Sequence, residues 1–378
     1  VVSLNAYVVS GSITLEDGSA LSDVNVRISN IYGNSLKTDL NGLYSIELPN
    51  VGKPHMVAPQ KTGYTFEPAY FYIKNISQPE TIHFVASPVP TDPINKKMIY
   101  YYINWGIYAR DYNVRDIPVE NITHINYAFV MPFVEPGILQ VGDEVEFRAG
   151  QSGKIITVSH TDSHSVGLVL TDEFADIQKY EAGDLGEPGQ YPSNIQEWLA
   201  IEEKSRGVLG QLIQLKKAQA SKGKDLKLIA SIGGWTLSQH FPAIAEDANF
   251  RTAFGEACFS FLEQTGFDGI DLDWEFPLVG GTDGTEQING RMIPAQPHTE
   301  KDPVNMLDLF KAIREEIGHN YELSIACAQA PSRILTQYVW PGVKENFNRA
   351  DHIMDYLDYV NTMTYDYGGY WSASTSHN

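Results

Sequence analysis

The pattern of apolar and polar residues changes once along the chain, near residue 90. Before that point, short runs of β-branched and aromatic residues alternate with turn residues, and no stretch has a helical period. These runs cover residues 7–15, 25–31, 44–48, 70–73 and 81–85. Short strands separated by turns are typical of small antiparallel structures, so residues 1–87 are predicted to form an all-β sandwich.

A proline-rich segment follows this region. Pro88, Pro90 and Pro93 lie within a few residues of one another, and the chain then runs through two lysines before the pattern changes. Closely spaced prolines favour a stiff, extended backbone. Residues 88–97 are therefore predicted to be a linker between two domains.

From residue 98 onward, apolar strand-like runs alternate with helical stretches. Amphipathic periodicity predicts helices over residues 249–265, ended by Gly266, and from Asp302, expected as the N-cap, to about residue 317. Repeated strand–helix units with continuously apolar strands indicate a parallel sheet covered by helices. A doubly wound sheet and a closed barrel both satisfy this pattern. The strand-like runs are residues 98–105, 124–130, 226–235, 267–275, 322–329 and 356–366.

One stretch interrupts this alternation. Residues 134–170 contain alternating runs at 144–148 and 154–159, separated by glycine-rich turns, and predict a β-hairpin-like insertion after the second strand. His160 and His164 lie in this insertion, but no further ligands stand at a suitable spacing. We therefore expect no metal site there.

The run of residues 267–275 contains the most informative chemistry. As a strand it has a period of two, so Asp271, Asp273 and Glu275 share one face, while the residues between them are apolar. Like charges this close cannot all ionise cheaply in a partly dry site. A carboxyl that keeps its proton near neutral pH can act as a general acid. An acidic edge strand and a hard-cation site are the alternatives.

The direction of this strand indicates which of the three acids lies nearest to the active site. In parallel α/β barrels the active site lies at the C-terminal ends of the strands, and Glu275 is the last of the three carboxylates along the run. Glu275 is therefore the predicted acid. Trp105 and Trp235 each end a predicted strand on the same side, where each indole is expected either to stack on a ring of a ligand or to pack in the core.

The charge balance narrows the range of ligands. The chain has 27 Lys and Arg against 47 Asp and Glu, for a net charge of -20. A polyanion would be repelled, so we expect no nucleic-acid partner. No apolar run is long enough for a membrane span, and the two cysteines form neither a disulfide framework nor a metal-spacing pattern. A neutral substrate suits this composition.

Four motifs resemble those of family 18 glycoside hydrolases, in the expected order. Asp268-Gly-Ile-Asp-Leu-Asp-Trp-Glu275 is similar to the family's DxxDxDxE signature, and the segment that starts at Ser231 is similar to its SxGG motif. Met363-Thr-Tyr-Asp366 resembles the MxYD motif, and the segment from Tyr101 resembles the first strand of the bacterial chitinase A-like subgroup. The segment from Gly11 through Val26 to Thr38-Asp-Leu-Asn-Gly-Leu-Tyr-Ser-Ile-Glu-Leu-Pro49 resembles the carboxypeptidase-regulatory or prealbumin-like sandwich.

This resemblance implies a (β/α)8 TIM barrel over residues 98–378 and a secreted chitinase that cuts β-1,4-linked N-acetylglucosamine polymers. The family retains configuration because the 2-acetamido group of the substrate attacks the anomeric carbon. The resemblance assigns Glu275 as acid and then base, Asp273 as the partner of the acetamido nitrogen, Asp271 as its proton-sharing neighbour, and Tyr365 as donor to the acetamido oxygen. It implies no cofactor. The other residues expected to contact substrate are Tyr101, Trp105, Ser231, Trp235, Asp268, Met363 and Asp366.

The pattern contains only about six of the eight strand–helix units that such a barrel needs. We therefore expect that a missing C-terminal segment, or else a second chain, completes the barrel. Three other interpretations remain open: an endo-β-N-acetylglucosaminidase acting on N-glycans, a lectin-like binding module, and a chitinase subunit of a larger toxin-like assembly. An intact Glu275 argues against the lectin.

Overall fold

The computed structural model describes residues 6–28, 35–49, 55–61, 64–68, 70–73, 76–88, 96–180, 191–288 and 290–366. The main parts of two compact units meet in the chain between Asn95 and Lys96. Most of the predicted linker, residues 89–95, lies outside the described residues, as do residues 367–378 of the predicted barrel. Each unit is therefore considered by itself.

The first unit contains two sheets around one apolar core. The five-stranded sheet has the order β4-β1-β9-β6 with β8 beside β1, and the four-stranded sheet has the order β3-β2-β5-β7. Val9 and Ile13 of one sheet and Val26 and Val57 of the other are fully buried in the same cluster. The strands are β1 (Ala6–Leu15), β2 (Asn25–Ile28), β3 (Ser35–Lys37), β4 (Leu43–Pro49), β5 (His55–Gln60), β6 (Tyr64–Glu67), β7 (Phe71–Ile73), β8 (Glu80–Thr81) and β9 (Phe84–Pro88).

The second unit is built on six parallel strands that pair in chain order, β10-β11-β15-β16-β19-β20. A doubly wound sheet changes direction at a switch point, and these six strands do not. In the described part of the chain, β10 pairs only with β11 and β20 only with β19. The bounds are β10 (Ile99–Ile103), β11 (His124–Pro136), β15 (Lys227–Gly233), β16 (Gly269–Asp273), β19 (Glu322–Ala328) and β20 (Tyr359–Met363).

The predicted insertion at residues 134–170 has three strands rather than two. β12 (Glu144–Arg148), β13 (Gln151–His160) and β14 (His164–Leu170) form an antiparallel group, and β14 pairs with residues 130–136 of β11. β11 is therefore longer than predicted, because its second half belongs to this extension. A separate apolar cluster, which includes Phe133, Ile155 and Leu237, joins the insertion to the loop after β15.

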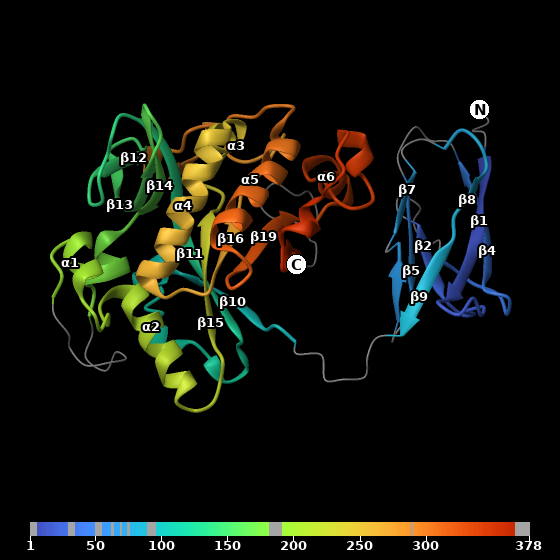
Figure 1. Ribbon diagram of the computed structural model, residues 1–378, viewed down its shortest axis with the longest axis horizontal. Coiled ribbons are helices and arrows are strands. Elements are labelled where there is room, and N and C mark those ends of the chain that lie inside the picture. The colour runs from blue at the N-terminus through green and yellow to red at the C-terminus, as the bar shows by residue number, and fades with distance from the viewer. Residues whose placement is uncertain are drawn as a thin grey trace. The chain divides into compact units, whose positions relative to one another are not determined.

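Helices cover one face of the parallel strands (Figure 1). Trp274 is fully buried and stacks on Phe241 of α3 with 5.5 Å between ring centroids, so the apolar side of β16 faces the helices. Asp247 caps α4, and Gly266 ends it with φ = 75°, a conformation that glycine adopts without strain. The helices are α1 (Ile195–Ala200), α2 (Gly207–Ala220), α3 (Phe241–Glu246), α4 (Ala248–Thr265), α5 (Asp302–Ile317) and α6 (Pro331–Gln337).

Two local details differ from the expectation. Asp302 begins α5 rather than capping it, and its buried carboxylate accepts hydrogen bonds from the backbone N–H groups of Leu278 and Thr299. The loop after β16 contains a small hairpin of β17 (Gln287–Ile288) and β18 (Arg291–Met292).

No described helix is long and apolar enough to cross a membrane. The short helices are η1 (Asn104–Ile107), η2 (Val114–Asp116), η3 (Val119–Asn121), η4 (Phe174–Gln178), η5 (Lys344–Phe347) and η6 (Ile353–Asp355).

Asp268 fastens the N-terminal ends of two strands. Its carboxylate accepts hydrogen bonds from Lys216 of α2, at 2.7 and 2.8 Å, and from the backbone N–H of Leu228 at the start of β15, at 2.8 Å. Since the side chain is mostly buried, these bonds are poorly replaced by water. This places Asp268 at the end of β16 opposite to Asp273.

We predict that Asp268→Ala lowers the free energy of unfolding by about 1–3 kcal/mol, because the half-buried Lys216 ammonium and the buried Leu228 N–H lose a charged acceptor. Urea unfolding followed by circular dichroism measures this change. Asp225→Ala is the matched control, since Asp225 forms an exposed ion pair with Lys227, and its expected effect is below about 0.5 kcal/mol. Equal effects of the two substitutions would contradict the fastening role.

Candidate active site

Asp271 lies at the centre of a hydrogen-bond network inside the sheet. It is fully buried on β16, and its neighbours in register on the adjacent strands are Ser231 and Ser324. Their hydroxyls donate to Asp271 at 2.9 and 2.6 Å, and Tyr101 and Asn361 donate at 2.8 and 3.2 Å. Each Asp271 oxygen therefore has two donors, which offsets the cost of burying a carboxylate.

Two of these donors lie on the first and last of the six strands. Tyr101 is on β10 and Asn361 on β20, yet the Asn361 side-chain amide also donates to the Tyr101 hydroxyl at 3.1 Å. A flat sheet would separate these strands by four intervening strands at about 4.8 Å spacing. The sheet is therefore strongly curled, with Asp271 on its concave side.

Asp273, two residues further along β16, has the opposite environment. It is buried, but its Oδ1 atom has no hydrogen-bond partner in the described structure. Burial, and then the negative charges of Glu275 and Asp271, raise the pKa of Asp273 well above its usual range. Both effects favour the protonated form of Asp273.

Glu275 follows the C-terminal end of β16 and is partly exposed. The strand was predicted to extend to Glu275, but β16 ends at Asp273. Glu275 therefore lies in the loop that follows the strand. Burial raises the pKa of Glu275 to about 7, a hydrogen bond from the backbone N–H of Trp235 lowers it, and the charge of Asp366 raises it. A carboxyl with such a pKa can give up and take back a proton near neutral pH.

A cavity of about 330 Å³ opens beside Asp273, whereas neither Asp271 nor Glu275 is among its lining residues. Its lining includes Asp273, Tyr101, Asn361, Met363 and Tyr365, and the remaining lining residues are Ile103, Ala128, Phe129, Ala326 and Thr362. The strands of the curled sheet thus place one carboxyl, one amide and two phenol groups around a largely apolar space. This composition suits a ligand with apolar faces and a few polar groups.

Tyr365, two residues after β20, lines the cavity. Tyr365 is 53% exposed, and burial, then the charges of Asp273, Glu275 and Asp366, raise its pKa to about 12. Tyr365 therefore remains a hydrogen-bond donor at neutral pH. Met363 lines the cavity wall, whereas Asp366 acts on Glu275 through its charge.

The two tryptophans are exposed near the ends of their strands. Trp105 is 47% exposed and stacks on Phe129, with 6.1 Å between ring centroids. Trp235 is 40% exposed, and its indole N–H donates to Glu286 at 3.1 Å. Both indoles therefore present surface to solvent while another residue holds their orientation, as a stacking platform requires.

Five residues expected to contact substrate do not line this cavity, namely Trp105, Ser231, Trp235, Asp268 and Asp366. Two of them, Ser231 and Asp268, are held by other partners. Ser231 is fully buried, and its hydroxyl is committed to Asp271. Asp268 lies at the opposite end of β16, bound to Lys216 and Leu228. Both residues support β16 instead of contacting substrate. Ser231 donates to Asp271, and Asp268 holds the start of the strand.

The sequence analysis missed Ser324, Asn361 and Ser238. The first two complete the set of donors to Asp271. The buried hydroxyl of Ser238 accepts from the backbone N–H of Glu275 at 3.1 Å and donates to the carbonyl oxygen of Gly234 at 2.9 Å. The position of Ser324 on the acid-facing side of the neighbouring strand is the signal that could have identified it.

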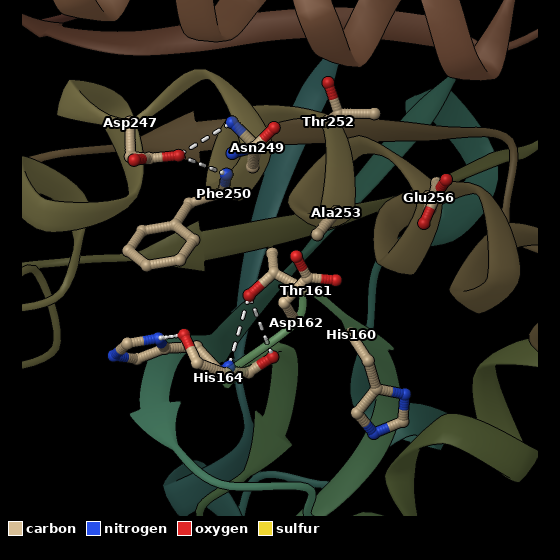
Figure 2. Close-up of a pocket in the computed structure, with 11 residues that line it drawn as sticks. His160, Thr161, Asp162, His164, Asp247, Asn249, Phe250, Thr252, Ala253 and Glu256 are labelled. Carbon is tan, nitrogen blue, oxygen red and sulfur yellow. Dashed lines mark hydrogen bonds between the residues drawn. The ribbon is translucent and has the colours of Figure 1, made fainter.

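A second pocket, of about 560 Å³, lies between the β13–β14 turn and the start of α4, and none of the three acids lines it (Figure 2). His160 and His164 are in its wall, but the Nε2 atom of His160 is bonded to the carbonyl of Leu139, and His164 Nδ1 pairs with the hydroxyl of Ser163. No group of three or more potential metal-binding side chains occurs among the described residues. This pocket contains none of the acid–base groups found at β16.

Comparisons with known proteins agree with the geometry. Chitinase ChiA of Flavobacterium johnsoniae is 31% identical over 284 residues, which cover 75% of this chain and 15% of that protein. Chitinase A1 of Niallia circulans is 31% identical over 308 residues, 78% of this chain and 38% of that one. The chain thus spans less than half the length of these curated relatives.

Among solved structures, chitinase ChiA74 from Bacillus thuringiensis matches with a TM-score of 0.54 and 28% identity, over 75% of this chain and 41% of that one. The model of the family described as "Glycosyl hydrolases family 18" matches residues 97–378, which contain β16 and every strand that surrounds Asp271. The chain therefore belongs to family 18 of the glycosyl hydrolases.

Proposed function

We propose that the protein is a chitinase that hydrolyses β-1,4 bonds of N-acetylglucosamine polymers with retention of configuration. The observation that carries this proposal is a cavity lined by Asp273, a buried carboxyl whose pKa is raised by burial and by the charge of Glu275, together with the pKa of about 7 of Glu275 itself. The names of the relatives, all chitinases, support chitin as the substrate class.

In the first step, Glu275 gives its proton to the glycosidic oxygen as the bond from that oxygen to the anomeric carbon breaks. The carbonyl oxygen of the substrate's own 2-acetamido group forms a new bond to the anomeric carbon, which yields a cyclic oxazolinium ion. The leaving sugar departs with the proton as a free hydroxyl. Glu275 is then a carboxylate next to the cationic ring.

In the second step, the Glu275 carboxylate takes a proton from water while the water oxygen attacks the anomeric carbon. The bond to the acetamido oxygen breaks, the acetamido group is restored, and Glu275 regains its proton. Two successive displacements at one carbon explain the retained configuration. A group with a pKa near 7 suits both halves of the cycle.

Asp273 and Tyr365 act on the acetamido group in this proposal. Asp273 accepts the acetamido N–H with its unpaired Oδ1 atom, and its raised pKa lets it share a proton with Asp271 as the ring becomes cationic, so that Glu275 stays a carboxylate for the second step. Tyr365 remains protonated and donates to the acetamido oxygen. Both contacts orient the internal nucleophile for attack.

We also propose that the six parallel strands belong to a (β/α)8 barrel and that the first unit is a prealbumin-like accessory module. The hydrogen bond between Tyr101 on β10 and Asn361 on β20 supports the curled sheet that a barrel requires. Two sheets around a shared core support the module. Because chitin is an insoluble polymer, we propose that the protein acts outside the cell.

Glu275→Gln is expected to lower kcat about 10²–10⁴-fold, because the amide cannot donate and recover a proton. Binding of a chito-oligosaccharide, measured by isothermal titration calorimetry, is expected to change little. Glu256→Gln, a neutralising change on the surface of α4, serves as the control and is expected to leave kcat unchanged. Hydrolysis by the Glu275→Gln protein at the wild-type rate would exclude Glu275 as the acid.

The pH dependence of kcat/KM tests the protonation state of Glu275. Because Glu275 must be protonated in the free enzyme and its pKa is about 7, kcat/KM is expected to fall as the pH rises above about 7. The raised pKa moves this loss to a higher pH than an ordinary glutamate would give. A profile that falls already between pH 4 and 5 would contradict the assignment.

Asp273→Asn is expected to lower kcat about 100-fold with a change in KM of less than about threefold. The amide fits the buried site, but it cannot exchange a proton with its acidic neighbours, so the acetamido group is no longer oriented as the charge develops. Steady-state kinetics on a defined N-acetylglucosamine hexamer separate the two parameters. Unchanged kcat would remove Asp273 from the mechanism.

A further inference from the structure

The loop of residues 234–238 connects the catalytic acid to the rest of the cleft. The backbone N–H of Trp235 donates to the Glu275 carboxylate, and the backbone N–H of Glu275 donates to the Ser238 hydroxyl. The backbone N–H of Gly234 donates to the carbonyl oxygen of Asp273 at 2.7 Å. Any movement of this loop therefore alters both the orientation and the proton affinity of Glu275.

Arg148, at the end of β12 in the insertion, holds the middle of this loop. Its guanidinium donates to the Thr236 hydroxyl at 2.7 Å and lies 5.5 Å from the centroid of the Phe147 ring. The Arg148 side chain is half-buried, burial lowers its pKa, and its Nε atom has no partner in the described structure. A partly desolvated guanidinium is costly, and the bond to Thr236 is the hydrogen bond that offsets this cost.

Two further contacts join the same segments. The Arg291 guanidinium, from the β17–β18 hairpin, donates to the carbonyl oxygen of Gly150 at 2.8 Å, next to the β12–β13 turn. The Trp235 indole donates to Glu286, just before that hairpin. The insertion tip, the loop after β15 and the loop after β16 are thus linked pairwise, and Trp235 makes one of these links.

We propose that Arg148 is a positioning residue that fixes the Trp235 loop, so that the insertion controls both the indole platform and the hydrogen bond to Glu275. This inference rests on the proposed function, because it assigns a role in the same site. The insertion at residues 134–170 would then influence catalysis although it contributes no residue to the catalytic strands.

The consequence for pH follows from the groups that face Glu275. These are Asp273 on β16, Asp366 and Tyr365 after β20, and Tyr338 after α6. None of them is a cation, so the Trp235 amide is the contact that favours the ionised form of Glu275 among those identified in the described structure. Loosening the loop weakens this hydrogen bond and raises the pKa of Glu275. The basic limb of the kcat/KM profile then moves to higher pH.

The test uses Arg148→Met, which keeps the length of the side chain and removes its donors. Expected results are amide hydrogen exchange about tenfold faster at Trp235 and Thr236, KM for a chito-hexaose about three- to tenfold higher, and a basic limb at higher pH. Arg148→Lys keeps one donor and is expected to restore part of each effect. Lys154→Met removes a cation from the same insertion, where Lys154 pairs with Glu144, and is the matched control.

A double-mutant cycle shows whether Thr236 is the partner. Thr236→Val alone is expected to reproduce the changes of Arg148→Met, and the double variant is expected to be no worse than either single one. The proposal is overturned if Arg148→Met matches Lys154→Met in all three readouts, or if the wild-type protein is active and only hydrogen exchange changes. Hydrogen exchange needs no substrate, so a wild-type protein without hydrolytic activity would refute the proposed function while the exchange data still decide whether Arg148 fixes the loop.

Discussion

A carboxylate buried inside a protein must be surrounded by donors, and Asp271 meets this requirement with groups from four other strands. The hydroxyls of Ser231 and Ser324 come from the strands on either side, while Tyr101 and Asn361 reach it from the two ends of the six-strand series. This one set of hydrogen bonds therefore depends on the curl of the whole sheet. It saturates both oxygens of Asp271, whereas the Oδ1 atom of Asp273 on the same strand has no partner in the described structure. The contrast between the two acids, one saturated and one with an unpaired oxygen, is what leaves a proton available beside Glu275.

Much of this arrangement follows from local sequence patterns. The period of two along β16 predicts that Asp271 and Asp273 face the interior, and Trp274 packs against α3 as the same alternation requires. The six parallel strands were predicted to within a few residues because each is a continuous apolar run. In the first unit, β3, β5 and β6 were missed, since each is short and lacks a clear alternation. Hydrophobic periodicity also could not distinguish an open sheet from a curled one, because the difference depends on which strands pair. The Tyr101–Asn361 hydrogen bond, which reveals the curl, joins residues far apart in the chain.

The motif residues show where reasoning from the sequence gives the position but not the role. Ser231 and Asp268 were expected to touch substrate, yet one is buried against Asp271 and the other holds the far end of the strand. A motif match indicates that a residue is important. Only the neighbours of that residue in the structure show whether it contacts the substrate or supports the residues that do. Arg148 is the converse case, since it lies outside every motif but reaches the loop that bonds to Glu275.

The central claim is that the proton near neutral pH resides on Asp273 and Glu275. Carbon-13 NMR of protein labelled at the Asp and Glu carboxyl carbons measures this directly, with Asp273→Asn and Glu275→Gln variants to assign the two signals. The account predicts that the signal of Asp273 remains in its protonated position at pH 6 and that the signal of Glu275 titrates with a midpoint near 7. Signals from both groups that titrate fully below pH 5, like those of exposed carboxylates, would contradict it.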